Sequence, residues 1–145
     1  MTVNVQVETT IARTPSEVAA YAGDPGNAPD WYVNIRSVAM RTPPPWGVGS
    51  RVDFVAQFLG RRIAYTYEVT AHDPGSRLVM RSADGPFPME TTYVWEPVVG
   101  GTRMILRNRG NPRGFAQLTG PLIEKAMRRA TTKDLARLKD LMESQ

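Results

Sequence analysis

The clearest pattern of hydrophobic and polar positions runs from Phe87 to Glu96. Alternate residues read Phe, Met, Thr, Tyr and Trp, and the residues between them read Pro, Glu, Thr, Val and Glu. Alternation of this kind predicts a strand with one apolar and one polar face. The apolar face still carries the hydroxyl groups of Thr91 and Tyr93, which a simple core would not need. We therefore expect this face to line a cavity.

Similar alternating segments predict a sheet of seven strands. The first runs from Val3 to Ile11, where every second residue is apolar or Thr. The others are Val33–Arg41, Ser50–Leu59, Arg62–Ala71, Arg77–Ala83, Phe87–Glu96 and Thr102–Arg109. Gly and Pro stand in the short breaks between neighbouring strands, which favours antiparallel hairpins.

Three turns predict how the strands pair. They are Gly60-Arg61, Asp84-Gly85 and the loop VVGG. The pairs that follow are Phe58–Ile63 and Phe54–Tyr67 for the first turn, Met80–Met89 and Leu78–Thr91 for the second, and Glu96–Arg103, Thr91–Asn108 and Glu90–Arg109 for the third. Each register brings apolar residues together on one face, and the third also pairs opposite charges on the other face.

Two short helices and one long helix complete the pattern. The segment TPSEV has Thr at the N-cap, Pro at the first helical position and Glu at the third, which predicts a helix that ends near Gly23. The segment NAPDWY predicts a second short helical turn. From Phe115 to Leu141 apolar residues recur at helical spacing. Pro121 either starts the main part of this helix or kinks it.

Length and composition restrict the class of protein. The 145 residues fit one domain, which we expect to span residues 1–145. No apolar run is long enough to span a membrane and the N-terminus lacks a signal-peptide pattern, so we expect a cytoplasmic protein. The absence of cysteine excludes disulfides and thiolate chemistry. We interpret the single histidine, His72, as a solvated turn residue, and we expect neither a metal site nor a cofactor.

The net charge of +4 does not indicate a nucleic-acid partner. Acidic and basic residues are mixed, and no block of five like charges occurs. The densest basic region, EKAMRRATTKDLARLKD, would lie mainly on the solvated side of the last helix. Arg107, Arg109 and Arg113 are alternative candidates for binding an anionic group near the mouth of a cavity.

The expected cavity has polar groups and apolar walls. The polar groups are Tyr65, Tyr67, Ser82, Thr91, Tyr93 and Asn108. The walls are Trp31, Tyr32, Phe54, Phe58, Phe87, Met89, Phe115, Leu118, Leu122 and Met127. Each residue taken alone could be an ordinary core residue whose polar atom is satisfied by a neighbour, but the group fits a pocket with a few oriented polar atoms. Candidate catalytic residues are Tyr65, Tyr67, Tyr93 and Asn108, which could polarise a carbonyl group.

The layout predicts an α+β fold in which a curved antiparallel sheet wraps around one long helix. A single helix is about 10 Å wide with its side chains and cannot fill a wide concave sheet, so a cavity remains between them. The chain also resembles the START, polyketide-cyclase and pollen-allergen superfamily (SRPBCC), and within it the bacterial polyketide cyclase/dehydrase and lipid-transport branch. The segments that carry the resemblance are IARTPSEVAAYAGDP, VNIRSVAM, VGSRVDF, YTYEVTAHDPGSRLVMRS and WEPVVGGTRMILR.

The resemblance implies a helix-grip fold, which hosts both carriers and enzymes. Our first hypothesis is a module that binds a small hydrophobic or aromatic molecule, such as a lipid, a polyketide or an isoprenoid. The second is a polyketide cyclase or dehydratase that uses the same cavity, and the third is a stress-related or co-chaperone interaction protein. We expect a monomer or a homodimer.

Overall fold

The predicted elements follow one another in the predicted order in a computed structural model of the chain. The structure describes residues 3–82, 88–111 and 120–145. The strands are β1 (Val3–Ile11), β2 (Ile35–Met40), β3 (Arg51–Phe58), β4 (Arg61–Asp73), β5 (Arg77–Ser82), β6 (Met89–Val98) and β7 (Gly101–Gly110). The helices are α1 (Pro15–Ala22), the 3-10 helix η1 (Pro25–Asn27), α2 (Ala28–Trp31) and α3 (Gly120–Glu143). The predicted α+β helix-grip fold is confirmed.

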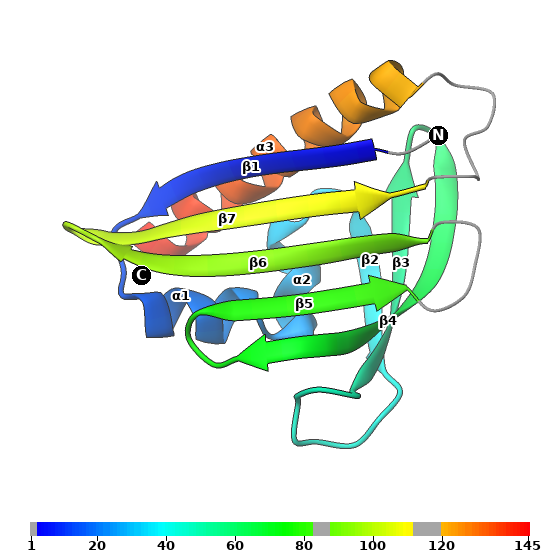
Figure 1. Cartoon of the computed structure of the whole chain (residues 1–145). Coiled ribbons are helices and arrows are strands. Elements are labelled where there is room, and N and C mark those ends of the chain that lie inside the picture. The colour runs from blue at the N-terminus through cyan, green and yellow to red at the C-terminus, as the bar shows by residue number, and fades with distance from the viewer. Residues whose placement is uncertain (1–2, 83–87, 112–119) are drawn as a thin grey trace.

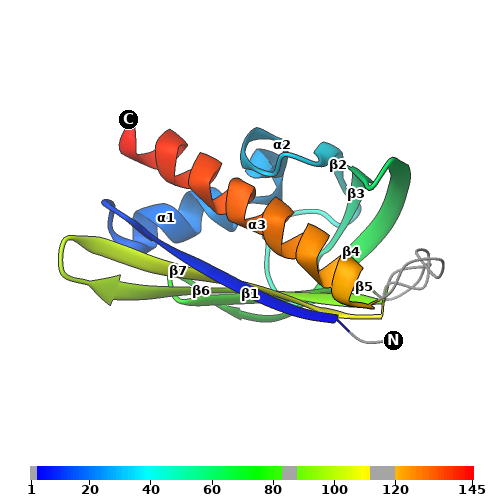
Figure 2. The ribbon, with the colours of Figure 1, turned by 90° about the horizontal axis from the view of Figure 1, so that it is seen from above.

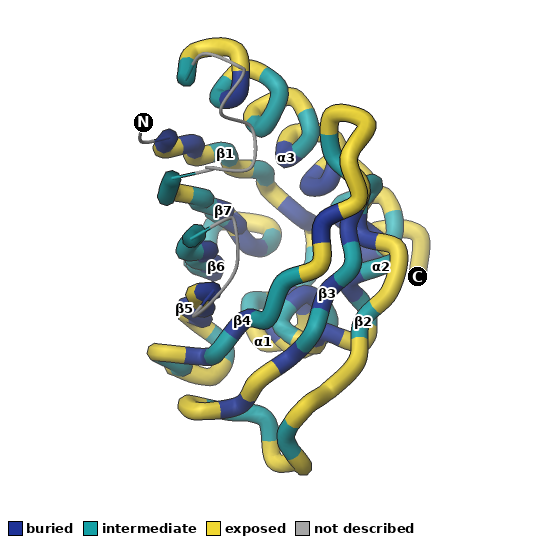
Figure 3. The backbone as a smooth tube through the Cα atoms, turned by 90° about the vertical axis from the view of Figure 1, so that its right-hand side faces the viewer, coloured by how far each residue is buried: buried dark blue, intermediate teal, exposed yellow. Residues whose placement is uncertain are grey.

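All seven strands belong to one antiparallel sheet with the order β1-β7-β6-β5-β4-β3-β2 (Figure 1). The pairing register shifts between Ile35 and Ser37 in β2 and between Val69 and Ala71 in β4. Such irregularities bend strands. Figure 3 shows the sheet curling from β1 through β5 and β4 to β3 and β2. Figure 2 shows α3 crossing the concave side of this curl, with α1 and α2 on the same side.

The predicted register of β6 and β7 is confirmed. Thr91 lies opposite Asn108, and Glu96 lies opposite Arg103. On the outer face Arg103 and Glu96 form an ion pair of 3.0 Å, and Arg109 forms one of 2.9 Å with Glu90. The loop between these strands therefore fixes which side chains of β6 and β7 meet inside the curl.

The predicted register of β3 and β4 is wrong by two residues. Phe58 lies opposite Arg61 instead of Ile63, and Phe54 lies opposite Tyr65. The turn is Leu59-Gly60, because both residues have positive φ angles, +51° and +76°. Two positive φ angles give a primed turn, whose twist matches that of the strands it joins.

The predicted register of β5 and β6 is also wrong by two residues. Met80 lies opposite Thr91 instead of Met89, and Leu78 lies opposite Tyr93. The Ser82 hydroxyl accepts a hydrogen bond of 2.9 Å from the backbone N–H of Met89, so the connection is longer than the predicted hairpin. The proposed turn at Asp84-Gly85 lies outside the described residues. Both errors leave every side chain on its predicted face, because the side-chain period of a strand is two.

The helix starts follow the sequence signals. Glu17 N–H donates to the Thr14 hydroxyl over 3.3 Å and the Glu17 carboxylate accepts from Thr14 N–H over 3.2 Å, which is the predicted capping box. Pro121 stands in the first turn of α3, so the prediction that it starts the main helix is confirmed. No helix in the described part of the chain has an apolar stretch that would reach across a bilayer.

The corrected turn gives a prediction for the hairpin of β3 and β4. Leu59→Asn should stabilise the protein by about 0.5–1 kcal/mol, because Asn adopts the left-handed conformation more easily than Leu. Gly60→Ala should destabilise it by about 1 kcal/mol through its positive φ alone, since a Cβ at Gly60 would meet no atom within 4 Å. Urea unfolding of both variants checks the pair. A turn at Gly60-Arg61 would instead make Leu59→Asn neutral or destabilising.

Candidate functional site

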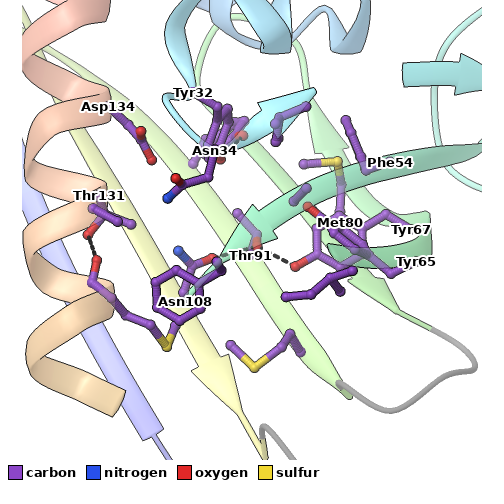
Figure 4. A pocket seen from close by; sticks show the side chains of 18 of the residues that line it. Tyr32, Asn34, Phe54, Tyr65, Tyr67, Met80, Thr91, Asn108, Thr131 and Asp134 are labelled. Carbon is purple, nitrogen blue, oxygen red and sulfur yellow. Dashed lines mark hydrogen bonds between the residues drawn. The ribbon is translucent and has the colours of Figure 1, made fainter. Parts of the chain in front are cut away.

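A cavity of about 170 Å³ lies between the concave face of the sheet and α3 (Figure 4). The cavity that the alternating pattern predicts is therefore present. Predicted residues that line it are Tyr32, Phe54, Phe58, Tyr65, Tyr67, Met89, Thr91, Tyr93, Asn108 and Met127. Further lining residues are Asn34, Ile35, Ala56, Ile63, Met80, Ile123, Ala130, Thr131 and Asp134. The role of these residues in ligand binding stays a prediction.

Three predicted residues lie elsewhere. Trp31 is fully buried beneath the cavity wall, where its ring lies 4.2 Å from that of Tyr32, so it supports the wall without lining it. Ser82 holds the backbone of Met89. Leu122 is 56% exposed on the outer side of α3, because the helix turns that position away from the sheet. Predicted wall residues outside the described part of the chain are Phe87, Phe115 and Leu118.

The hydroxyl groups among the apolar side chains form a directed hydrogen-bond chain. The Thr91 hydroxyl donates to Asn108 Oδ1 over 2.6 Å. Because Thr91 has one hydroxyl proton, the bond of 2.7 Å between Tyr67 and Thr91 must run from the Tyr67 hydroxyl to the Thr91 oxygen. The chain ends at Asn108, whose amide nitrogen has no hydrogen-bond partner among the described residues. This leaves the N–H donors of one amide group for a molecule in the cavity.

A second pair of hydroxyl groups joins β6 to the residue that follows α2. Tyr32 and Tyr93 share a hydrogen bond of 2.5 Å between their hydroxyl oxygens. Figure 4 shows Asn34 close to Tyr32, with its amide group extending toward the space beside α3. Asn34 thus adds a second amide to the polar atoms of an otherwise apolar and aromatic wall.

The tyrosines remain neutral at physiological pH. Burial raises the pKa of Tyr32 and of Tyr65 well above the usual value of 10.0. Burial also raises the pKa of Tyr67, to about 12, and that of Tyr93 further. These hydroxyls can therefore donate or accept hydrogen bonds, but they cannot act as bases near pH 7.

Asp134 is the functional candidate that the sequence analysis missed. It lies on α3, lines the cavity and is only 3% exposed. Its carboxylate accepts a hydrogen bond of 2.8 Å from the backbone N–H of Val33. Burial raises the pKa of Asp134 from 3.8 to about 7, although the Val33 hydrogen bond and the charge of Arg137 oppose that shift. Asp134 thus has the pKa that acid–base chemistry at neutral pH requires.

A sequence signal for Asp134 does exist. Residues Ile123, Met127, Thr131, Asp134 and Leu138 follow one another at spacings of three and four, so Asp134 falls on the inner stripe of the helix. Its charge and the neighbouring Lys133 made it look like part of a solvated face.

The other polar residues discussed from sequence lie away from the cavity. The interpretation of His72 as a solvated turn residue is wrong, because β4 extends through His72, which pairs with Leu78 and is half-buried; it does not line the cavity. Arg107 donates to the side chain of Asn4, and Arg109 pairs with Glu90, both on the outer face of the sheet. Arg113 lies outside the described residues.

Comparison with known proteins agrees with this architecture. A protein of Thermus thermophilus superposes with a TM-score of 0.80 at 23% identity, covering 94% of both chains. The Zhui aromatase/cyclase of a Streptomyces species superposes with a TM-score of 0.79 at 16% identity, covering 99% of this chain and 94% of that one. The protein Ara h 8.0201 reaches 0.68 at 13% identity over the whole of both chains. At these identities the likeness concerns the fold alone.

Sequence comparison identifies the family directly. None of the curated proteins compared with the chain matches its sequence. The family model described as "Polyketide cyclase / dehydrase and lipid transport" matches residues 2–143, which is nearly the whole chain. The chain therefore belongs to the polyketide cyclase/dehydrase and lipid-transport family, within the SRPBCC superfamily.

Proposed function

We propose that the chain binds a small hydrophobic or aromatic molecule, of the lipid, polyketide or isoprenoid type, in the cavity between the sheet and α3. One observation carries the proposal: the hydrogen-bond chain through Thr91 ends in an Asn108 amide that has no partner among the described residues and faces a largely apolar and aromatic wall. An apolar wall removes the ligand from water, at about 25 cal/mol for each Å² buried. The amide would fix the orientation of one acceptor group on the ligand.

The volume limits the ligand in the present conformation. A dry cavity of about 150 Å³ accommodates a benzene molecule, and the cavity here has about 170 Å³. A single ring or a short aliphatic chain fills it. A larger molecule has to extend through the mouth or widen the cavity.

Asp134 favours a second candidate function, a cyclase or dehydratase. A carboxyl group with a pKa of about 7 can remove a proton from a carbon next to a carbonyl and return it to a departing hydroxyl group. The Asn108 amide or a neutral tyrosine hydroxyl would polarise that carbonyl. The wall would hold a flexible chain in a conformation suitable for ring closure. The similarity in fold to an aromatase/cyclase is compatible with this candidate.

Native mass spectrometry of freshly purified protein, followed by solvent extraction, tests the proposal most directly. We expect a discrete extra mass that extraction releases as an apolar or aromatic compound. A clean mass of the chain alone, unchanged by a panel of lipids and aromatic compounds, would contradict ligand binding in the cavity.

The free amide predicts a preference for ligands with an acceptor group. Acetophenone and ethylbenzene have nearly the same shape, but only acetophenone carries a carbonyl. The native protein should prefer acetophenone, and Asn108→Leu should reduce that preference roughly five- to tenfold, the value of about one hydrogen bond. Thr91→Val is the matched control, because it disrupts the internal chain but keeps the amide. Titrations followed by NMR measure both affinities, and equal preferences in native protein and Asn108→Leu would exclude this role of Asn108.

Asp134 also predicts how stability depends on pH. The folded protein holds the Asp134 proton up to about pH 7, whereas the unfolded chain releases it near 3.8. Protonation of Asp134 therefore contributes stability that is fully present below about pH 4 and is lost as pH rises through about 7. The contribution amounts to up to about 4 kcal/mol. Asp134→Asn should remove this loss and still accept the hydrogen bond from Val33.

Urea unfolding between pH 4 and pH 8 measures the effect. The exposed residue Asp140, on the same helix, provides the control variant Asp140→Asn, which should follow the native curve. Parallel curves for native protein and Asp134→Asn would show that Asp134 is not held protonated. Where turnover is found, Asp134→Asn should abolish it while retaining ligand binding, whereas a carrier would lose nothing.

A further inference from the structure

A groove outside the cavity begins where the cavity ends. It lies between the tip of the β3–β4 hairpin and the outer side of α3 and has a volume of about 360 Å³. Asn34, Phe58 and Ala130 line both the groove and the cavity, so the two spaces adjoin. Apolar side chains on the groove include Leu59, which is 46% exposed, and Leu122, which is 56% exposed. We call this space the α3 groove.

One side of the α3 groove is a row of cations. Lys125, Arg129 and Lys133 line it and follow one another at intervals of four residues. The row is about 12 Å long at the rise of an α-helix. All three side chains are exposed, and none has a hydrogen bond or an ion pair with another described residue. Their charges are therefore available to a molecule in the groove.

Three of the four carboxylates on α3 are engaged elsewhere, and the fourth, Asp140, is exposed and lies beyond the row toward the C-terminus. Glu124 accepts a hydrogen bond from the backbone N–H of Asn4, Asp134 accepts one from Val33, and Glu143 pairs with Lys139 at 2.9 Å. The cations first considered from sequence, Arg107 and Arg109, lie on the outer face of the sheet. The cations that line the groove therefore all come from α3.

The interior disfavours an anion. The cavity wall is apolar and aromatic, and its titratable carboxyl group, Asp134, becomes negative as pH rises through about 7. A second negative charge inside would meet both desolvation and repulsion. An anionic group attached to a molecule in the cavity would therefore be favoured outside it, beside the cations.

We propose that the ligand is an anionic amphiphile whose apolar part occupies the cavity and whose carboxylate or phosphate binds Lys125, Arg129 and Lys133 in the α3 groove. This inference rests on the proposed function, because it requires the apolar part to be bound. A ligand larger than one ring that extends past Asn34 and Phe58 enters the groove that the cations line. Since the row borders a groove that adjoins the cavity, a free amphiphile fits it better than a broad membrane surface.

Octanoate, octyl phosphate and octanol test the head group with one common chain. The native protein should bind at least one of the two anions roughly tenfold more tightly than octanol, since each partly exposed ion pair adds a factor of a few. The triple variant Lys125→Gln, Arg129→Gln, Lys133→Gln should lose this preference and keep the octanol affinity. The matched control removes three exposed cations outside both spaces: Arg62→Gln, Arg77→Gln, Arg81→Gln. Calorimetry at about 0.05 M and about 0.5 M salt should show the preference shrinking at high salt.

The outcomes separate the two proposals. Whichever anion shows the larger preference identifies the head group as a carboxylate or a phosphate. Equal binding of octanol and both anions, or a preference that survives the triple variant, would overturn the head-group site and leave the cavity proposal intact. Failure of all three compounds to bind would overturn the head-group site, whereas the cavity proposal would fall only if acetophenone and ethylbenzene also fail to bind. Cosedimentation with vesicles that contain anionic lipid completes the test. If the triple variant loses vesicle binding but keeps its preference for the anions, the three cations serve a membrane surface. That outcome would overturn the inference.

Discussion

The structure depends on one geometric mismatch, between a single helix and a strongly curved sheet. The 24 residues of α3 form a cylinder about 10 Å wide, whereas seven strands about 4.8 Å apart make a much wider sheet. The helix packs closely along β1, and α1 and α2 cover part of the same side (Figure 2). The curl of β3 and β4 toward α3 encloses the part of the concave side that the helices do not fill. The cavity is therefore a consequence of the architecture, and the side chains decide its chemistry.

Enclosure makes every polar atom on the concave face expensive unless it has a partner. The hydroxyls of Tyr67 and Thr91 meet this requirement through one another and through Asn108. Thr and Tyr are thus compatible with a dry wall. Both of their hydroxyl protons are used within the chain, so the N–H donors still available are those of the Asn108 amide. The same requirement explains Asp134, whose carboxyl combines one backbone hydrogen bond with a raised pKa in place of a counter-ion.

The sequence predicted the faces of the strands better than their partners. Alternation assigns each side chain to a face, and an error of two residues in the Leu59-Gly60 hairpin does not change that assignment. The register depends on backbone angles at the turn, and a left-handed Leu59 has no signature in the hydrophobic pattern. Asp134 was missed because charge outweighed its position on the helical stripe. Trp31 was placed on the wall because the curvature that buries it beneath Tyr32 involves strands distant in sequence.

The charged side chains of α3 point in three directions: toward β1, toward the cavity and toward the tip of the β3–β4 hairpin. The expectation that they lie mainly on one solvated side of the helix overlooks this division. Toward the edge strand β1, Glu124 accepts from Asn4 N–H, Arg128 donates to the carbonyl of Gln6 and Lys139 donates to that of Thr10. Unpaired backbone groups of an edge strand invite pairing with other chains, and these side chains occupy them. Toward the cavity the helix presents Asp134, and toward the hairpin tip it presents Lys125, Arg129 and Lys133. A rotation of about 100° per residue separates Lys133 from Asp134, so adjacent residues of opposite charge serve different surfaces. One helix thereby closes the sheet edge, sets the polarity of the interior and gives the mouth its positive charge.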